Sequence, residues 1–331
     1  MHNFYSTISR LSYFQIILLQ VFFLNCVFAS DSDDAILILT PPGELFASAI
    51  VGIQEETDDY FKVTVLEISK ENEGGGEIER YFASTTPKVI VILGNQLLKL
   101  YTKFIHEHKP DVSRIPVISI YALDTERAIG HLNNAQGISS QTPMVTAITK
   151  FRWIVTTKIN KVGVIYRDAC EELVVENTKL CEREKITINS IKISNQTQNY
   201  KKEISDALKH LIKKEQVDAI WIPNDNVILS SELLGGVWIP LLNKANIPVI
   251  VGVEVLVKPE LNFGTFAVIP DPKGTGMQAA ELIFDLKYNN WELPEIRMYP
   301  TLSVYSVLNY KKAAKIINRN NMNTITKIFE H

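Results

Sequence analysis

The sequence predicts an α/β protein of two similar lobes, each built around a parallel sheet, with a cleft between them. The first observation is a repeated order of apolar segments. AILILT, KVIVILGN and IPVI begin at residues 35, 88 and 115, and KVGVIYRD, VDAIWIPN and IPVI begin at residues 161, 217 and 247. The second is their spacing, 53 and 27 residues between successive starts in the first half and 56 and 30 in the second. The third is their richness in Val and Ile, which is typical of parallel strands buried on both faces.

The first 29 residues have the pattern of a secretory signal peptide. Arg10 is the one Lys or Arg of the segment, a mainly apolar run follows it, and Val27-Phe28-Ala29 places small residues where a signal peptidase would cut. An uncleaved membrane anchor is the alternative, because the run is close to the length that spans a bilayer. A lipoprotein would use Cys26, but Asn25 stands where a small residue is expected. We therefore expect a periplasmic or extracytoplasmic protein.

Composition excludes several classes of protein. The chain has 331 residues, enough for two lobes, and a formal net charge of −3. Without a basic cluster it lacks the electrostatic footprint of a nucleic-acid-binding protein. After cleavage only Cys170 and Cys181 remain, and eleven residues of one helix would separate them by about 16 Å, beyond disulfide reach. We expect both to be ordinary core positions.

Amphipathic helical patterns lie where the connections between strands should be. Each has an apolar stripe suited to covering one face of a sheet. Strand, helix and strand in this order predict a doubly wound, Rossmann-like arrangement in each lobe. The expected stripes are Phe46, Ile50 and Ile53; Met144, Ile148, Phe151 and Val155; Ile204, Leu208, Leu211 and Ile212; and Ala279, Leu282, Ile283 and Leu286.

The remaining segments set the domain organisation. Residues 70–79, charged and with three consecutive glycines, are expected to form a mobile loop, and the chain is expected to change lobe within residues 131–142. The tail adds a strand at 265–270, a helix at 274–287 and a strand-like run near 299–308. This predicts several hinge crossings. The expected division is a signal peptide at 1–29, a first lobe at 30–136 plus 254–296, and a second lobe at 137–253 plus 297–331.

An ordered set of turns and strand ends resembles a known family. Gly94-Asn95 after a buried strand, the IPVI strand, the turn QGIS at 136–139 and the strand KVGVIY at 161–166 are similar to the substrate-binding proteins of ABC transporters, with the type I periplasmic binding-protein fold. The likeness is to the group that includes tryptophan- and tyrosine-uptake candidates. It runs from about residue 35 to NYKKAAKII at 309–317. The sequence departs from the family at 253–276 and at Tyr121-Ala122-Leu123-Asp124, where the family usually has Asp-Pro.

The resemblance implies an extracytoplasmic solute-binding protein that captures a small ligand between its lobes and delivers it to a membrane permease. It implies an aromatic or other amino acid as one ligand class, contact with the membrane only through the transporter, and a monomer. No catalysis, cofactor or metal is expected. The alternative to a transport role is a ligand-binding sensor module that acts with a membrane receptor. The identity of the ligand is left open.

Candidate ligand-binding residues follow from a general rule, since open parallel sheets bind ligands outside the carboxyl ends of their strands. In the first lobe Gly43 precedes a helix whose free N–H groups suit an anion. Tyrosines could stack on a flat ligand, and Arg167 could pair with a carboxylate, although acidic neighbours compete for it. The full set of candidates is Thr40, Gly43, Glu44, Phe46, Gly94, Asn95, Tyr121, Ser140, Gln141, Tyr166, Asp168, Asn224, Asp225 and Glu254.

Catalytic motifs are nearly absent from the sequence. It contains no HExxH, GxSxG, Walker or paired CxxC pattern. Residues 274–279, GTGMQA, fit GxGxxA, which keeps an exported nucleotide-dependent enzyme as a further alternative. Such a fingerprint normally opens the first strand–helix unit, so a helix start that needs close packing is the preferred interpretation.

Overall fold

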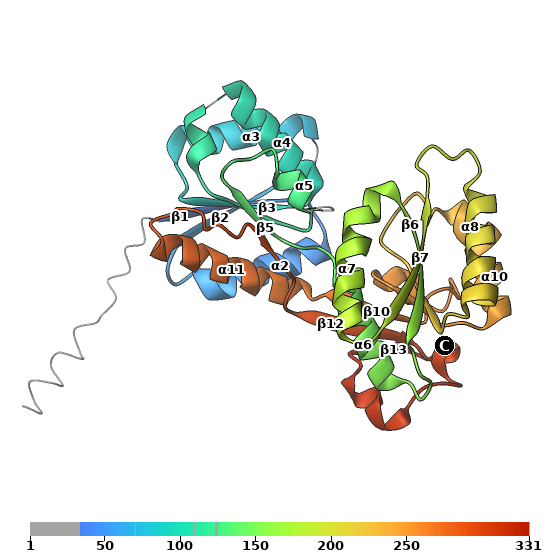
Figure 1. Cartoon of the computed structure of the whole chain (residues 1–331). Coiled ribbons are helices and arrows are strands. Elements are labelled where there is room, and N and C mark those ends of the chain that lie inside the picture. Colours follow the sequence, from blue (N-terminus) through green and yellow to red (C-terminus); the bar gives the residue numbers. More distant parts are fainter. Residues whose placement is uncertain (1–33, 70, 109, 123–124, 331) are drawn as a thin grey trace, which may run out of the picture.

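The structure, a computed structural model, describes residues 34–69, 71–108, 110–122 and 125–330, which form two α/β lobes (Figure 1). Each lobe has its own sheet, of six strands in the first and seven in the second, so the predicted fold class is confirmed. The expected signal peptide at 1–29 lies outside the described residues. Within the described ranges, no helix is both long and apolar enough to cross a bilayer.

The first lobe contains a six-stranded sheet in which every strand pair is parallel. The strand order is β11-β5-β4-β3-β1-β2. Helices α3, α4 and α5 lie on one side of this sheet, and α2 and α11 lie on the other (Figure 1). The elements are β1 (Ala35–Thr40), α2 (Glu44–Thr57), β2 (Lys62–Glu67), α3 (Glu71–Ser84), β3 (Val89–Leu93), α4 (Asn95–His108), η1 (Pro110–Arg114), β4 (Val117–Ile120), α5 (Thr125–Ile129), β5 (Ala135–Ile138), α11 (Pro272–Tyr288) and β11 (Met298–Tyr299).

The second lobe repeats this plan with one additional strand at one edge. Its strand order is β13-β12-β10-β9-β8-β6-β7, and among the strand pairs of the described residues only β10–β12 is antiparallel in this sheet. The elements are α6 (Met144–Ile154), β6 (Lys161–Arg167), η2 (Asp168–Cys170), α7 (Glu171–Arg183), β7 (Thr187–Ile193), α8 (Tyr200–His210), η3 (Leu211–Glu215), β8 (Ala219–Trp221), α9 (Ser231–Leu233), η4 (Leu234–Trp238), α10 (Ile239–Ala245), β9 (Val249–Val251), η5 (Glu254–Val257), β10 (Phe266–Pro270), β12 (Val304–Asn309), α12 (Tyr310–Ala313), η6 (Arg319–Thr324) and β13 (Lys327–Phe329).

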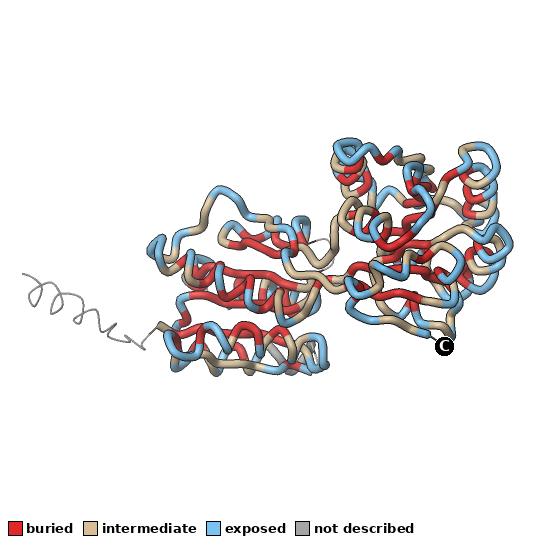
Figure 2. The backbone as a smooth tube through the Cα atoms, turned by 90° about the horizontal axis from the view of Figure 1, so that it is seen from below, coloured by how far each residue is buried: buried red, intermediate tan, exposed pale blue. Residues whose placement is uncertain are grey.

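Apolar side chains on both faces of each sheet form the core. Strands β1 and β3 are buried along their whole length, because helices cover both of their faces. Figure 2 shows the buried backbone concentrated in two separate bodies joined by a few segments. Cys181 is buried in the core of the second lobe, as expected, whereas Cys170 is only half-buried and packs against that core.

Three crossovers join the lobes. The chain passes from β5 to α6, returns from β10 to α11, and passes again from β11 to β12. Asp271 and Ser303 tie the last two together, because the Asp271 N–H donates to the Ser303 carbonyl over 2.9 Å. The buried Gln278 side chain also holds the third crossover, donating to the Pro300 carbonyl and accepting from the Leu302 N–H.

The positions of these crossovers determine which edges of the two sheets face each other. In the first lobe β5 and β11 end at a crossover, and every other strand is parallel to them. In the second lobe β10 ends at Pro270, directly before a crossover, and is parallel to β9, β8 and β6. The carboxyl edge of each sheet therefore lies on the side joined to the other lobe.

One segment differs from the sequence-based expectation of a mobile loop. Residues 71–79 belong to helix α3, which continues to Ser84. The helix is held by Ile78 and Phe82, one turn apart and both buried in the core beside Leu37 and Ile90. Connecting β2 to β3 requires the chain to cross the face of β1, and this packing outweighs the low helix propensity of the glycines.

The lobe boundaries also differ from the expected ones. Strand β10 was expected in the first lobe with residues 254–296, but it pairs with β9 and β12 in the second. The run near 299–308 is two strands, β11 in the first lobe and β12 in the second. Apolar pattern identifies a strand but not the sheet that accepts it, because both sheets offer similar apolar edges.

Candidate functional site

In the first lobe, three of the expected ligand-binding residues, Gly43, Gly94 and Tyr121, lie around the aromatic ring of a fourth, Phe46. A Cβ atom built on Gly43 or Gly94 would lie 3.6 Å or 3.9 Å from the ring of Phe46. Tyr121 meets the same ring edge-on, with 6.0 Å between ring centroids. These residues come from the carboxyl ends of β1, β3 and β4, which are neighbours in the sheet. The strand-end rule therefore brings distant parts of the sequence to one place.

The backbone at this place is unusual. Gly43 has φ 138° and Gly94 has φ 83°, conformations that side chains rarely adopt, which explains why glycine stands at both turns. Tyr121 has φ 59°, in the small left-handed region that is costly for a bulky residue. The turn after β4 thus holds the Tyr121 ring beside Phe46 at some expense in conformational energy.

The Tyr121 hydroxyl is buried and makes no hydrogen bond of normal geometry with the described residues, although the Thr275 side chain lies near it. Burial raises the pKa of Tyr121 to about 12; the nearby Thr275 side chain opposes this shift and the Asp271 carboxylate adds to it. The Thr275 hydroxyl itself donates to the Asp271 carbonyl over 2.8 Å. A buried hydroxyl without a partner costs roughly 1–3 kcal/mol, so this group is available to a ligand at little further cost.

The unsatisfied hydroxyl of Tyr121 gives a testable prediction for the ligand-free protein. Tyr121→Phe removes an unsatisfied polar group, so the free energy of unfolding in urea should stay level or rise by about 1 kcal/mol. Tyr305→Phe is the matched control, because the Tyr305 hydroxyl donates to Glu254 over 3.0 Å and its loss should be destabilising. Equal destabilisation by the two variants would show that the Tyr121 hydroxyl has a partner in solution.

The second lobe contributes a small hollow at its own carboxyl edge. It is lined by Gln141 and Thr142 from the first crossover, by Asn224 after β8, and by Gly252 after β9. The Thr142 hydroxyl and the Asn224 side-chain oxygen are both buried and unpartnered among the described residues. Gly252 leaves room for the Asn224 amide, since a Cβ atom there would lie 2.6 Å from the amide oxygen.

Arg167 and Asp225 form an ion pair beside this hollow. The guanidinium donates to both carboxylate oxygens over 2.7 Å and 2.8 Å, and the side chains are 15% and 4% exposed. The hydrogen bond to Asp225 raises the pKa of Arg167. Asp225 also accepts from the Val227 N–H. Arg167 and Asp225 therefore pair with each other within the lobe, and Asp225 also holds the loop that carries Asn224.

Two other expected acidic residues also have partners within the protein. Asp168 pairs with Lys192 over 2.8 Å and accepts from the Asn195 N–H, and these contacts lower its pKa. Glu254 accepts from the Tyr305 hydroxyl and pairs with Lys327 over 2.6 Å. Although burial opposes it, these contacts leave the pKa of Glu254 lowered. Both carboxylates are therefore held by partners within the protein.

The remaining expected residues divide by exposure. Thr40 and Tyr166 are 1% and 8% exposed, the former donating to the Pro41 carbonyl and the latter packed in the core. Glu44 and Asn95 are exposed in the first turns of α2 and α4. The Ser140 hydroxyl donates to the Ala122 carbonyl over 2.9 Å and so ties the first crossover to the end of β4.

Thr142 is the residue that sequence reasoning missed. It follows directly after Ser140 and Gln141, in the crossover that was expected to carry ligand contacts. The available signal was its place in that segment. What the sequence could not indicate is that its hydroxyl would be buried and lack a partner in the described part of the chain, since this depends on the packing of β8 and β9.

The glycine-rich helix start at 274–279 has a packing explanation. A Cβ atom on Gly274 would lie 2.3 Å from the Ser303 side chain, and one on Gly276 would lie 2.0 Å from the Ala49 carbonyl oxygen. Asp271 caps the helix by accepting from the Gly274 N–H. In the described ranges, no group of three or more His, Cys, Asp or Glu side chains is placed to hold a metal.

Comparisons with known proteins show where this architecture occurs. No family model and no curated protein matches the chain. Among solved structures, a ligand-free, open substrate-binding protein with adhesive properties from Clostridium difficile superposes with a TM-score of 0.63 at 14% identity, covering 89% of this chain and 98% of that one.

Two further structures match over similar lengths. An ABC domain in complex with L-Trp from Streptococcus pneumonia has a TM-score of 0.51 at 16% identity, covering 89% of this chain and 100% of that one. A periplasmic ribose ABC transporter protein from Conexibacter woesei has a TM-score of 0.51 at 14% identity, covering 84% and 92%. With the two sheets and three crossovers, these likenesses show that the chain has the type I periplasmic binding-protein fold.

Proposed function

We propose that this protein is an extracytoplasmic solute-binding protein that captures a small ligand between its lobes and delivers it to the permease of an ABC transporter. One observation carries the proposal. The carboxyl edges of two separate sheets lie on the sides joined by the crossovers, and each edge holds at least one buried polar group without a partner among the described residues. These groups are the Tyr121 hydroxyl in the first lobe and Thr142 and Asn224 in the second.

The mechanism is a shift between open and closed arrangements of the lobes. A ligand held by one lobe alone gains only that lobe's contacts, whereas a ligand in the closed form gains both sets. It therefore stabilises closure by its differential affinity for the two forms. The three crossovers provide the hinge, and the closed form is the one that a permease would recognise.

The chemistry of the two edges favours a small amino acid with a flat side chain. The N-terminal turns of α2 and α4 present free N–H groups suited to a carboxylate. Phe46 and Tyr121 offer an aromatic surface for a flat group. Glu44 and the Asn224 side-chain oxygen are acceptors for an ammonium group. The complex with L-Trp in a protein of the same fold supports this ligand class.

A ligand screen tests the proposal directly. The purified protein, without residues 1–29, is heated with amino acids, sugars and nucleosides in turn, and a bound solute raises the melting temperature by mass action. We expect an amino acid to give the largest rise. Calorimetry with that solute should show affinity about 5–10-fold weaker for Asn224→Ala and for Asn95→Ala, as expected for one lost hydrogen bond each.

Asn133→Ala is the matched control for these variants. Asn133 is exposed two residues before β5, at the amino edge of the first sheet and away from the expected ligand. Its substitution should leave both affinity and melting temperature unchanged. The proposal fails if no solute of the screen shifts the melting temperature, and the placement of the site fails if all three variants bind equally well.

A further inference from the structure

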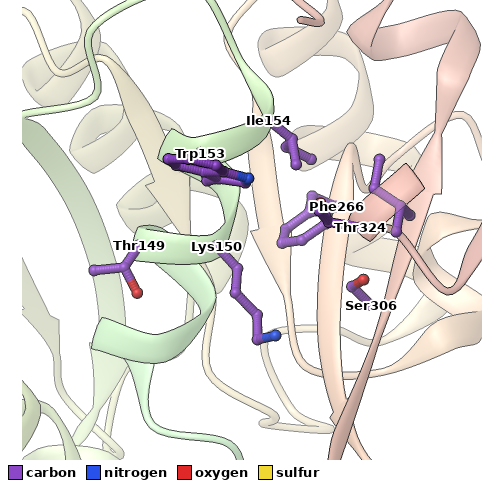
Figure 3. A pocket seen from close by; sticks show the side chains of 8 residues that line it. Thr149, Lys150, Trp153, Ile154, Phe266, Ser306 and Thr324 are labelled. Atoms are coloured by element: carbon purple, nitrogen blue, oxygen red, sulfur yellow. The ribbon is translucent and has the colours of Figure 1, made fainter. Parts of the chain in front are cut away.

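The second lobe contains a larger cavity, of about 260 Å³, which the proposed function does not use (Figure 3). It lies between helix α6, strands β10 and β12, and the segment after η6 near the C-terminus. The side chains that carry the argument below are Lys150, Trp153, Phe266, Ser306, Thr324 and Ile325.

This cavity is separate from the edges that would hold the transported solute. Phe266 is the first residue of β10, whereas the crossover follows the last, Pro270. Lys150 and Trp153 lie in the second half of α6, whose first residue, Met144, is the one nearest the crossover. None of the residues expected at the carboxyl edges lines it. A ligand here would bind to one lobe only.

Half of the residues that line the cavity are apolar or aromatic. Phe266 and Ile325 are buried, at 1% and 8% exposure, and form part of the core of the lobe. Trp153, by contrast, is 62% exposed. A large aromatic side chain that borders a cavity and remains exposed provides a surface that a flat ligand could cover.

Two of the polar groups that line the cavity, Lys150 and Ser306, can donate to a ligand, whereas the Thr149 and Thr324 hydroxyls donate to backbone carbonyls of the protein. Lys150 has no ion-pair partner among the described residues, and Figure 3 shows its ammonium group and the indole nitrogen of Trp153 directed to the side where Phe266 and Ser306 lie. The Ser306 oxygen accepts from the Thr326 N–H, which leaves its own proton to donate. No carboxylate is among the described residues that line the cavity. One cation and one available hydroxyl donor, with no opposing carboxylate among them, favour an anion.

We infer that this cavity is a second ligand site, which binds a small organic carboxylate with a flat apolar body. The carboxylate contacts the Lys150 ammonium and the Ser306 hydroxyl, and the apolar body packs against Trp153 and Phe266. Its volume lies just below the range of about 300–1,000 Å³ usual for drug-sized ligands, so the ligand is an acid of one or two rings.

Ligand-observed fluorine NMR with 4-fluorobenzoate tests this inference. The native protein should broaden the fluorine signal saturably, and the neutral 4-fluorobenzamide should bind more weakly, by up to about five-fold, because an ion pair at an exposed lysine contributes up to about that factor. Lys150→Ala should remove this preference for the acid, and Lys150→Arg should keep it. Trp153→Ala should weaken both compounds.

Two control variants decide where the acid binds. Lys158→Ala removes an exposed lysine of the same lobe outside the cavity and should bind 4-fluorobenzoate like the native protein. Asn224→Ala should do the same, because the hollow at the carboxyl edge is not involved. Equal binding of acid and amide, unchanged binding by Lys150→Ala, or loss of binding by Asn224→Ala would each overturn the inference.

Discussion

Gly276→Ala should lower the melting temperature by about 5–10 °C, as expected for overpacking that costs about 2–3 kcal/mol or more. The added Cβ atom would lie 2.0 Å from the carbonyl oxygen of Ala49 on helix α2. Gly52 of α2 faces α11 in the same way, with a Cβ position 2.1 Å from the Lys273 carbonyl oxygen. The neighbours are backbone atoms, so the two helices must separate to accommodate even one methyl group.

The control for this substitution is Gly235→Ala. Gly235 lies in the helical segment η4, and a Cβ atom there meets nothing within 4 Å. Alanine should leave stability level or raise it slightly, because it restricts the unfolded chain. The melting temperatures are compared by circular dichroism. Close packing of α2 on α11 would be contradicted if Gly276→Ala melted within about 1 °C of Gly235→Ala.

Asp225→Ala should lower the free energy of unfolding by about 2–4 kcal/mol, because it leaves the largely buried guanidinium of Arg167 without its carboxylate. We expect a loss of stability below the upper end of the range for buried ion pairs, because Arg167 is 15% exposed and also donates to the Asn195 side chain. Urea unfolding measures the loss. The same variant should weaken solute binding, since Asp225 holds the loop that presents Asn224.

A surface ion pair provides the control. Lys201 and Glu232 lie 2.8 Å apart but are 55% and 74% exposed, so Glu232→Ala should leave the free energy of unfolding almost unchanged. The double variant Arg167→Met with Asp225→Leu should recover much of the stability lost by Asp225→Ala, because no unpaired charge remains. Similar losses for Asp225→Ala and Glu232→Ala would show that the first pair is not protected from water.

Much of the fold could be predicted because buried parallel strands have a distinctive local composition. The runs at 35–40, 88–95 and 161–168 contain β1, β3 and β6. Where tertiary packing outweighed local composition, the prediction was wrong. The glycines at 74–76 predicted a loop, but Ile78 and Phe82 anchor helix α3. A strand-like run near 299–308 predicted one strand, but the chain changes lobe within it.

The candidate site was predictable to the extent that it follows from strand ends. The rule that ligands bind at the carboxyl edge selected Gly43, Phe46, Gly94 and Tyr121, and the structure brings these four together. The pairing of Arg167 with Asp225 could not be chosen over nearer acidic residues. It depends on β6 and β8 being adjacent, which places their carboxyl ends side by side although the residues are far apart in sequence.

Small-angle X-ray scattering, with and without the solute that most raises the melting temperature, tests the central claim most directly. If the lobes close over that solute, the radius of gyration should fall saturably with its concentration, with a midpoint that matches the calorimetric affinity. Asn133→Ala should reproduce this change, and Asn224→Ala should require more solute for it. Saturable binding with an unchanged radius of gyration would contradict capture by closure of the two lobes.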